Sequence, residues 1–314
     1  MKKSWRQAVD NLQLRHPGQG IGCLSGLFGK SREGYYSVSR SRREHKELSE
    51  EEIVSTVKDI RREAPGLGAF KLFLMLKELY PDEMRGRDWF YRLMHERHLM
   101  LKPPRRRHTT NSNHNFRKYK NQAKGIVLTG MNQLWVADIT YIETDDGVVY
   151  LHLVTDAYTH EIIGWALSDS LVASNTAAAL DMGISNMSCY GLEGLMHHSD
   201  RGVQYCCNMY TDRLKSINAT ISMTEDYKPT DNAIAERVNG IIKQEWLYRR
   251  KRPRNLEEAR VELEQIIYFY NNRRKHRRNK DNMTPVEFRK YLISKALNGG
   301  FAPPAAGLPP QCFS

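Results

Sequence analysis

Three acidic residues constrain this chain most: Asp138, Asp200 and Glu236, each in a different and recognisable sequence context. Positions 201–235 separate the last two. Hard divalent cations such as Mg²⁺ prefer oxygen ligands and bind through a few carboxylates together with a substrate phosphate. A fold that brings carboxylates together from three different elements therefore predicts a two-metal site for phosphoryl transfer.

Asp138 is the only charge in the run LWVADITYI at 134–142, whose apolar and β-branched residues predict a buried strand. An unpaired carboxylate is costly to bury, so this side chain needs a partner, and a metal ion is one such partner. A turn hydrogen bond at a strand end is the alternative interpretation of this residue taken alone.

Asp200 follows a second predicted strand, LMHH at 195–198, in the turn formed by residues 199–202. Open α/β sheets place their ligands at the carboxyl ends of the strands. His197 and His198 are adjacent and point to opposite faces of a strand, so they cannot both bind one ion. We interpret His197 as structural and His198 as a neighbour of the substrate.

Glu236 lies on a predicted helix, whose start is marked by the Pro-Thr-Asp sequence at 229–231. A polar stripe runs along this helix at positions i, i+4, i+7 and i+11, formed by Asn232, Glu236, Asn239 and Lys243. A solvated face is the usual reason for such a stripe. The spacing from Asp200 instead favours a functional stripe.

These residues lie in a segment, 135–245, that resembles the catalytic core of bacterial insertion-sequence transposases of the DDE, or retroviral-integrase-like, superfamily. The resemblance is to the OrfB product of the IS-three family. It is carried by the stretches WVADITYI, GVVYLHLVTDAYTHEIIGW, HHSDRGVQY, SMTEDYKPTDNA and AERVNGIIKQE. Segments 24–36, 49–101 and 270–288 are similar to the opening segment, the helix-turn-helix module and the end of the core in the same family.

The resemblance implies that Asp138, Asp200 and Glu236 are the catalytic and metal-binding triad. It implies two Mg²⁺ ions as cofactors, with Mn²⁺ as an alternative, and a contact between Lys243 and the DNA end. We expect Asn232 and Asn239, on the same stripe, to contact DNA as well. Three residues depart from the family pattern between the second and third carboxylates, namely Thr224, Glu225 and Lys228 in place of serine, arginine and glycine.

The net charge of +12 is distributed unevenly. Residues 1–130 carry 27 Lys and Arg against 14 Asp and Glu, residues 131–243 carry 6 against 15, and residues 244–314 carry 15 against 7. Basic flanks suit the phosphate backbone of DNA, and an acidic centre attracts cations. The alternative is that basic surface only keeps the protein soluble.

The five cysteines contain no CxxC pair and no His/Cys spacing suited to zinc, which argues against a zinc-binding domain like that of retroviral integrases. An odd number with one adjacent pair indicates a reducing compartment. No apolar stretch approaches the roughly twenty residues of a membrane span, and the first residues lack the apolar core of a secretory signal. We expect a soluble cytoplasmic protein associated with the nucleoid.

Three short helices are predicted between 49 and 102, the first beginning at a capping box formed by Ser49 and Glu52. We interpret them as a helix-turn-helix domain that lays its third helix, about 87–97, in the major groove. That helix would present Arg87, Tyr91 and Arg92 to DNA. A small bundle that only packs on the core has the same pattern. The basic arm that follows, with Arg105, Arg106 and Arg107, is expected to contact the DNA backbone.

The core is predicted to begin with three antiparallel strands, the first two joined by a hairpin at Asp145-Asp146-Gly147. A helix over 173–187, the strand before Asp200, a helix over 203–217 and a strand at 220–223 follow. This order predicts an α/β fold with the mixed sheet of a ribonuclease-H-like core. Asp156, in the second strand, is a rival for the triad, and its place before a turn suits a structural role.

We divide the chain into a basic N-terminal segment (1–48), a helix-turn-helix DNA-binding domain (49–102), a basic linker (103–130), an integrase-like catalytic core (131–250), a C-terminal helical extension (251–297) and a disordered tail (298–314). The extension holds an amphipathic helix over 256–272, which we expect to pack on the core. Basic clusters at 249–252 and 273–278 flank that helix and are expected to hold phosphates.

The hypothesis that follows is a DNA transposase that cleaves insertion-sequence ends and transfers the strand to a new site. Double-stranded DNA would be its substrate, a homo-oligomer its active form, and the upstream OrfA product a further partner. Two alternatives remain open. One is a ribonuclease-H-like DNA nuclease without strand transfer, and the other is a DNA-binding regulator without catalysis.

Overall fold

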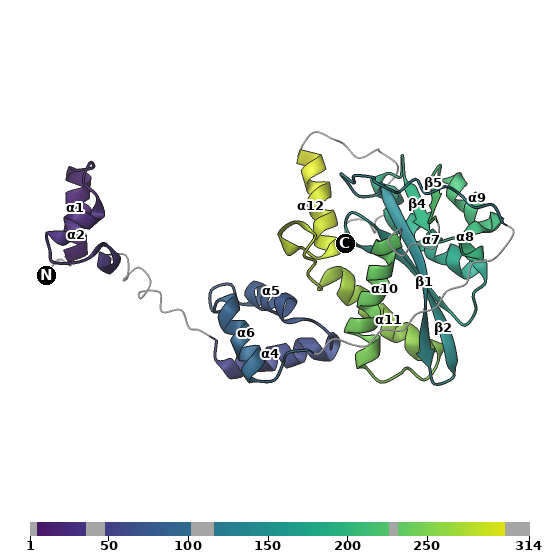
Figure 1. Cartoon of the computed structure of the whole chain (residues 1–314), viewed down its shortest axis with the longest axis horizontal. Helices are drawn as coiled ribbons and strands as arrows, with labels where there is room; N and C mark the ends of the chain where they lie inside the picture. The colour runs from purple at the N-terminus through teal and green to yellow at the C-terminus, as the bar shows by residue number, and fades with distance from the viewer. Residues whose placement is uncertain (1–4, 36–47, 102–115, 226–231, 299–314) are drawn as a thin grey trace.

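The computed structural model describes residues 5–35, 48–101, 116–225 and 232–298. Figure 1 shows short N-terminal helices, then the helical group α4 to α6, then a larger unit built around a sheet. The N-terminal helices are α1 (Trp5–Arg15) and α2 (Ile21–Gly26), and the group of three is α4 (Glu50–Glu63), α5 (Ala69–Leu79) and α6 (Arg87–Glu96). The predicted linker arginines, Arg105, Arg106 and Arg107, and the predicted tail from 299 onward lie outside the described residues.

The three-helix group, α4 to α6, forms because each helix has an apolar face and a defined start. Ser49 caps α4: its hydroxyl accepts a hydrogen bond from the Glu52 backbone, and the Glu52 carboxylate accepts one from the Ser49 backbone. The predicted capping box is therefore confirmed. Buried apolar residues on the three helices, among them Ile53, Leu72 and Phe90, join one cluster.

The sheet has five strands in the order β3-β2-β1-β4-β5. The strands are β1 (Leu134–Thr144), β2 (Gly147–Asp156), β3 (Ile162–Ser168), β4 (Met196–Ser199) and β5 (Thr220–Met223). β1 and β2 are antiparallel, as are β2 and β3, whereas β4 pairs parallel with β1 and β5 parallel with β4. This mixed sheet confirms the predicted ribonuclease-H-like core, including the hairpin between β1 and β2.

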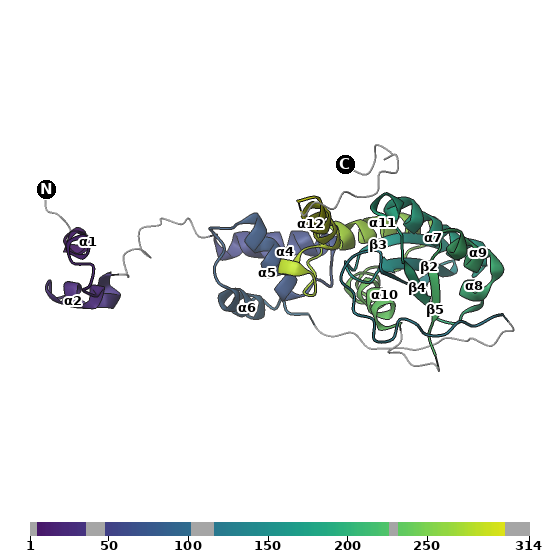
Figure 2. The same cartoon turned by 90° about the horizontal axis from the view of Figure 1, so that it is seen from above.

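Helices cover both faces of the sheet, as the view from above shows (Figure 2). One apolar cluster joins Trp135 and Val154 of the sheet to α7 (Ala173–Met187), α8 (Val203–Cys206) and α9 (Asn208–Ser216). On the other face, Leu151 and Leu153 pack with α10 (Ala233–Glu245) and α11 (Leu256–Asn272). The short turns η1 (Ser188–Tyr190), η3 (Leu247–Arg249) and η4 (Lys280–Asn282) and the last helix, α12 (Pro285–Asn298), complete the described elements.

Of two predicted helices in the sheet unit, the structure confirms one and corrects the other. The amphipathic helix over 256–272 is confirmed as α11, and its buried face, with Ala259, Leu263 and Ile266, packs in the core. The single helix predicted over 203–217 was wrong. Cys207 has extended backbone angles, ends α8 and caps α9, so two short helices replace one.

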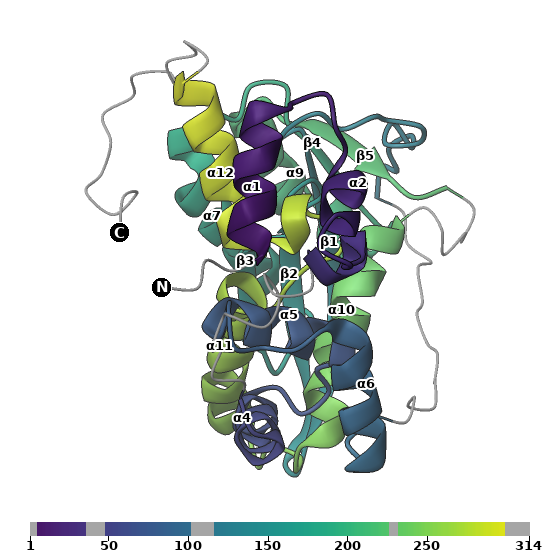
Figure 3. The same ribbon diagram turned by 90° about the vertical axis from the view of Figure 1, so that its left-hand side faces the viewer.

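The helical group packs against the ends of α10 and α11, and Figure 3 shows α4, α5 and α6 in front of those two helices. The Gly66 amide donates to the Glu245 carbonyl, and the Trp246 indole donates to the Glu63 carbonyl. Gly66 allows this approach because a Cβ there would lie 2.3 Å from the Glu245 Cα. Residues from the helical group and from the sheet unit therefore share one apolar cluster.

None of the helices within the described ranges is both long and apolar enough to span a membrane.

Candidate active site

The register of the sheet brings Asp138 and Asp200 together. β1 and β4 are parallel, with Leu134 opposite Met196 and Val136 opposite His198. Continuing that register by two residues places Asp138 of β1 beside Asp200, the first residue after β4. Two carboxylates predicted on separate strands thus meet at neighbouring positions in the sheet.

Asp138 is partly buried, and both its oxygens accept hydrogen bonds. Oδ1 accepts from the Ile139 backbone amide at 2.9 Å, and Oδ2 accepts from Asn239 Nδ2 at 2.8 Å. Burial and the neighbouring Asp200 raise the pKa of Asp138 to about 7, against the lowering effect of these two hydrogen bonds, and Glu236 raises it further. This environment therefore disfavours the ionised form of the Asp138 carboxylate.

Glu236 lies on the first turn of α10, the helix that covers the same face of the sheet as Asp138 and its strand neighbour Leu153. Its side chain is exposed, whereas Asn232 and Asn239 of the same stripe are buried. Asn232 Nδ2 donates to the Ala137 carbonyl at 3.0 Å, so both asparagines hold α10 against β1. The polar stripe is therefore a packing surface as well as part of the site, and the predicted DNA contacts of the two asparagines stay predictions.

The three carboxylates affect one another electrically but do not form a complete ligand set. Within the described residues, no group of three or more His, Cys, Asp and Glu side chains is placed to hold a metal ion. Asp138 is electrostatically coupled to both Asp200 and Glu236. The expectation that the fold gathers all three carboxylates around shared metal ions stays a prediction.

The chemistry of the donors still fits a hard divalent cation. The available ligands are carboxylate oxygens, and Asn239 adds an amide oxygen, Oδ1, that is buried and has no hydrogen-bond partner among the described residues. Burial and the adjacent carboxylates raise the pKa of Asp138, and a cation at this position would offset both effects.

Lys243 supplies positive charge at the far end of the stripe. Its ammonium lies 4.1 Å from the centre of the Tyr141 ring, and the side chain is half-buried. Burial lowers the pKa of Lys243, and attraction to Asp138 and Glu143 opposes that change. Lys243 is therefore a cation held near the carboxylates by an aromatic ring of β1.

Asp156 has the structural role that its position predicted. It is fully buried, and its oxygens accept hydrogen bonds from the backbone amides of Asn132, Tyr158 and Thr159 and from the Thr159 hydroxyl. These bonds fix the turn between β2 and β3. The four donors leave Asp156 committed to the fold and away from the proposed triad.

The two histidines of β4 are both buried. His197 Nε2 lies 2.9 Å from the Tyr210 hydroxyl, which agrees with the structural role predicted for it. His198 Nδ1 lies 2.8 Å from the Ser222 hydroxyl of β5, and only 1% of its surface is exposed. That His198 neighbours the substrate stays a prediction, and its buried ring contacts the neighbouring strand β5.

The residues predicted to read DNA from the third helix have different surroundings. Arg87 and Arg92 are exposed and form ion pairs with Asp88 and Glu96 of the same helix. Tyr91 is half-buried and lines a pocket between the helical group and α10. Their contacts with DNA stay predictions.

Sequence reasoning missed an ion-pair network at the junction of the two units. Glu245 contacts Lys71 Nζ at 2.7 Å and Arg274 Nη2 at 2.7 Å, and all three side chains are mostly buried. The three residues belong to α10, α5 and the segment after α11. No local sequence pattern relates them, because Lys71 and Glu245 are 174 positions apart.

Comparison with known proteins agrees with this geometry. The sequence matches the family "Integrase core domain" over residues 129–229 and a second family of the same description over 218–285. It is similar to the "Insertion element IS600 uncharacterized 31 kDa protein" of Shigella sonnei, with 34% identity over 84% of this chain and 96% of that protein. It is also similar to "Transposase InsF for insertion sequence IS3A" of Escherichia coli, with 35% identity over 38% of this chain and 41% of that protein.

Among solved structures, the catalytic core domain of the HTLV-2 integrase in complex with magnesium is similar, at 18% identity and a TM-score of 0.40, over 50% of this chain and 96% of that one. The family assignment depends on the sequence matches, which cover the strands, the carboxylates and α10. The chain belongs to the bacterial insertion-sequence transposases of the DDE superfamily, which share an integrase core.

Proposed function

We propose that this transposase cleaves the ends of an insertion sequence and joins the freed strand to new DNA, using Asp138, Asp200 and Glu236. The observation that carries the proposal is the parallel register of β1 and β4, which leads Asp138 toward Asp200, together with the electrostatic coupling of these two carboxylates beside α10. Divalent-metal dependence belongs to the integrase-core family, and the donors here are of the right type.

Asp138, Asp200 and Glu236 would hold the ions. When bound, two Mg²⁺ ions, or Mn²⁺ in their place, would supply Lewis-acid stabilisation to the attacking and leaving oxygens of the phosphodiester. Glu236 must approach the aspartate pair to complete the ligand set, and its exposed side chain can change rotamer for this. Residues 226–231, which precede α10, lie outside the described residues.

The remaining residues of the site position these groups. Asn239 fixes the orientation of the Asp138 carboxylate, and Asn232 fixes the start of α10. Lys243 would hold a phosphate of the DNA end through its positive charge, with Tyr141 restricting its motion. None of these roles requires a covalent bond between protein and DNA.

The substrate we propose is double-stranded DNA, both as element ends and as target. Because two ends must be joined in one event, we propose a homo-oligomer on DNA, and the OrfA product as a further partner for end recognition. A bacterial DNA substrate places the protein in the cytoplasm, with the nucleoid.

The test uses the full chain, Mg²⁺ and pre-cut DNA ends taken from the sequences that flank the gene. Joined products support the transposase with strand transfer. Cleavage without joining supports a nuclease, and binding without either reaction supports a regulator. Each of the last two outcomes overturns the proposal.

A further inference from the structure

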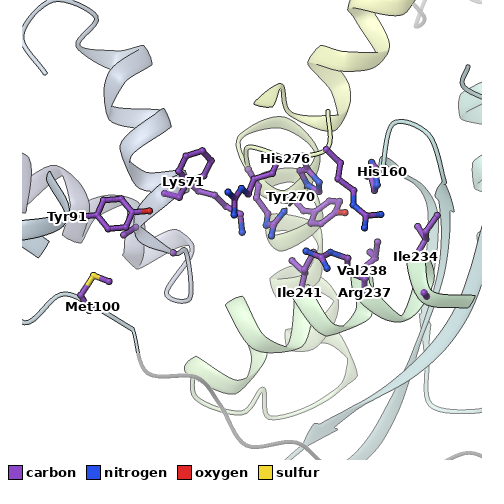
Figure 4. A pocket seen from close by; sticks show the side chains of 17 residues that line it. Lys71, Tyr91, Met100, His160, Ile234, Arg237, Val238, Ile241, Tyr270 and His276 are labelled. Carbon is purple, nitrogen blue, oxygen red and sulfur yellow. Dashed lines mark hydrogen bonds between the residues drawn. The ribbon is translucent and has the colours of Figure 1, made fainter. Parts of the chain in front are cut away.

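A cavity of about 580 Å³ lies between the helical group and the sheet unit. Figure 4 shows Lys71 and Tyr91 on the side of the helical group and Arg237 and Ile241 on α10. The side chains of α10 that line it are separated by three or four positions and lie opposite the stripe that carries Glu236. The cavity and the candidate active site therefore lie on two sides of one helix.

The lining of this cavity is positively charged. It contains Lys71, Arg237, Arg274, Arg277 and Arg278. Among the described residues that line it, none is Asp or Glu. Glu245, just outside the lining, is shared by two of the cations.

The charges of the buried part do not balance. Lys71 and Arg274 have side chains that are 18% and 5% exposed, and they face the single carboxylate of Glu245. Burial and repulsion by Arg274 lower the pKa of Lys71 to about 8, even though Glu245 and its hydrogen bond raise it. The ion pair with Glu245 is therefore not enough to restore the usual pKa of Lys71.

Burial and nearby cations also lower the pKa of the two histidines in the cavity. Burial lowers the pKa of His160, and Arg278 and Arg237 lower it further. Burial and Arg274 hold the pKa of His276 well below its usual value. Burial therefore disfavours the charged forms of Lys71, His160 and His276, and the nearby arginines add to that effect.

Two exposed arginines at the opening are available for a ligand. Arg237 and Arg278 have no ion pair with any described carboxylate. Neighbouring cations are already used by the fold, since Arg273 pairs with Glu63 and Lys275 with Glu78 and Glu287. The basic cluster over 273–278 is therefore divided between residues that join the two units and residues that remain available.

We propose that this cavity binds a backbone phosphate of double-stranded DNA, with Arg237 and Arg278 as direct contacts and the buried Lys71 and Arg274 as fixed positive charge. The proposal rests on the proposed function, because DNA is the substrate there. One helix diameter, about 10 Å, separates the cavity from the Glu236 stripe. At about 3.4 Å per step, that distance is three base-pair steps of a duplex that also reaches the carboxylates.

The test measures DNA binding by the full chain with EDTA present, so that no metal-dependent reaction contributes. A short fluorescent duplex from the sequence flanking the gene is titrated across salt concentrations between about 50 and 200 mM. Replacing one phosphate contact reduces the slope of log K against log salt by about 0.9. We expect that reduction for Arg237→Gln and for Arg278→Gln, and twice that reduction for the double variant.

The matched control is Lys215→Gln, which removes one exposed positive charge from α9, far from the cavity, where Lys215 pairs with Asp212. We expect its slope to equal that of the wild type. A double variant with an unchanged slope overturns the proposal, as does a control that loses as much as the arginine variants.

A second measurement uses the wild-type chain and does not depend on the folding of a variant. Lys71 is labelled with an acetylating reagent, and the extent is read by mass spectrometry with no addition, with the duplex, or with inorganic phosphate. Protection of Lys71 by the duplex supports the proposal. Protection by inorganic phosphate without protection by the duplex identifies a small-anion site and overturns it.

The two proposals fail separately. If the wild-type protein joins ends and the arginine variants bind DNA normally, the phosphate-binding role of the cavity is refuted and the transposase function is retained. If the wild-type protein joins no ends and the arginine variants lose salt-dependent DNA binding, the phosphate-binding role of the cavity is retained and the strand-transfer reaction is refuted.

Discussion

The two sides of α10 face environments of opposite charge. On one side, Asp138 and Asp200 stand beside each other near Glu236, and the pKa of Asp138 is raised to about 7. On the other side, Lys71 and Arg274 share one carboxylate, and the pKa of Lys71 is lowered to about 8. Negative charge is therefore concentrated on one side of α10 and positive charge on the other, an arrangement that suits the metal ions and the DNA of the proposed function.

The two sides also differ in how they are held together. Amide hydrogen bonds from Asn232 and Asn239 attach α10 to β1 on the acidic side. A buried ion-pair network centred on Glu245 attaches it to the helical group on the basic side. The hydrogen bonds on the acidic side come from neutral amide groups, whereas the ion pairs on the basic side all depend on the Glu245 carboxylate.

The largest effect is expected from Asp138→Asn. Loss of one metal ligand removes several kcal/mol of transition-state stabilisation, so joining and cleavage should fall by roughly 10³-fold or more. The measurement is product formation from pre-cut ends with Mg²⁺. Asp146→Asn, in the exposed turn between β1 and β2, is the matched control and should retain activity.

The same variant should be more stable than the wild type without metal above pH 7. The folded pKa of Asp138, about 7, lies above the ordinary value of 3.8, so ionising it costs stability as the pH rises through that window. The asparagine has no such cost, and the free Asn239 Oδ1 can accept from its amide after a flip. A thermal midpoint that is lower than wild type at about pH 8 would contradict the assigned cause of the shift.

The next largest effect is expected from Glu245→Gln, which leaves Lys71 and Arg274 buried without a carboxylate. Breaking a buried ion pair in this way typically costs 3–5 kcal/mol, so the free energy of unfolding should fall by about that amount. Glu96→Gln is the control, because Glu96 and its partner Arg92 are 59% and 67% exposed, and it should cost at most about 1 kcal/mol. Equal losses measured by chemical denaturation would show that the network has no special role.

A smaller effect is expected from Gly66→Ala. The added Cβ would lie 2.3 Å from the Glu245 Cα, so the backbones of the two units must separate, at a cost of about 1–3 kcal/mol. Gly240→Ala, inside α10 with open space around it, should instead stabilise by about 0.5–1 kcal/mol. Hydrogen exchange at the α4–α5 junction distinguishes them, and faster exchange in both variants would refute the interpretation.

The smallest effect concerns Lys71 and pH. Its folded pKa, about 8, lies below the usual 10.5, so the protein gains stability as the pH rises from 8 to 10.5 and pays the full penalty below 8. A bound phosphate needs the charged amine, so DNA affinity should fall by up to roughly tenfold between about pH 8 and about pH 9. Lys71→Arg keeps its charge and should bind DNA equally at both pH values in an anisotropy titration.

Local sequence patterns predicted most of the helices and strands correctly, because both the patterns and these elements involve residues that are close in the sequence. The capping box at Ser49, the hairpin after Thr144 and the buried face of α11 each depend on residues a few positions apart. The break at Cys207 was missed because its extended backbone has no proline or glycine to mark it. The burial of His198 beside Ser222 could not be predicted, because it depends on the pairing of β4 with the more distant strand β5.

The candidate site was predictable in its residues but only partly in its geometry. The three carboxylates and the stripe of α10 were identified from the sequence, and the family matches cover them. The pairing of Asp138 with Asp200 required the register of two strands that are far apart in the chain. The electrostatic coupling of Glu236 to Asp138 depends on the position of α10 against β1, which the sequence does not reveal.

The sequence by itself determined which side chains are candidates for the chemistry, since carboxylates in a strand, after a strand and on a helix are features of neighbouring residues. Only the tertiary structure decided that α10 separates an acidic site from a basic cavity, and that Glu245 joins Lys71 to Arg274. The physical reason is that electrostatic balance depends on distance in space and on burial, and both arise only when remote segments pack together.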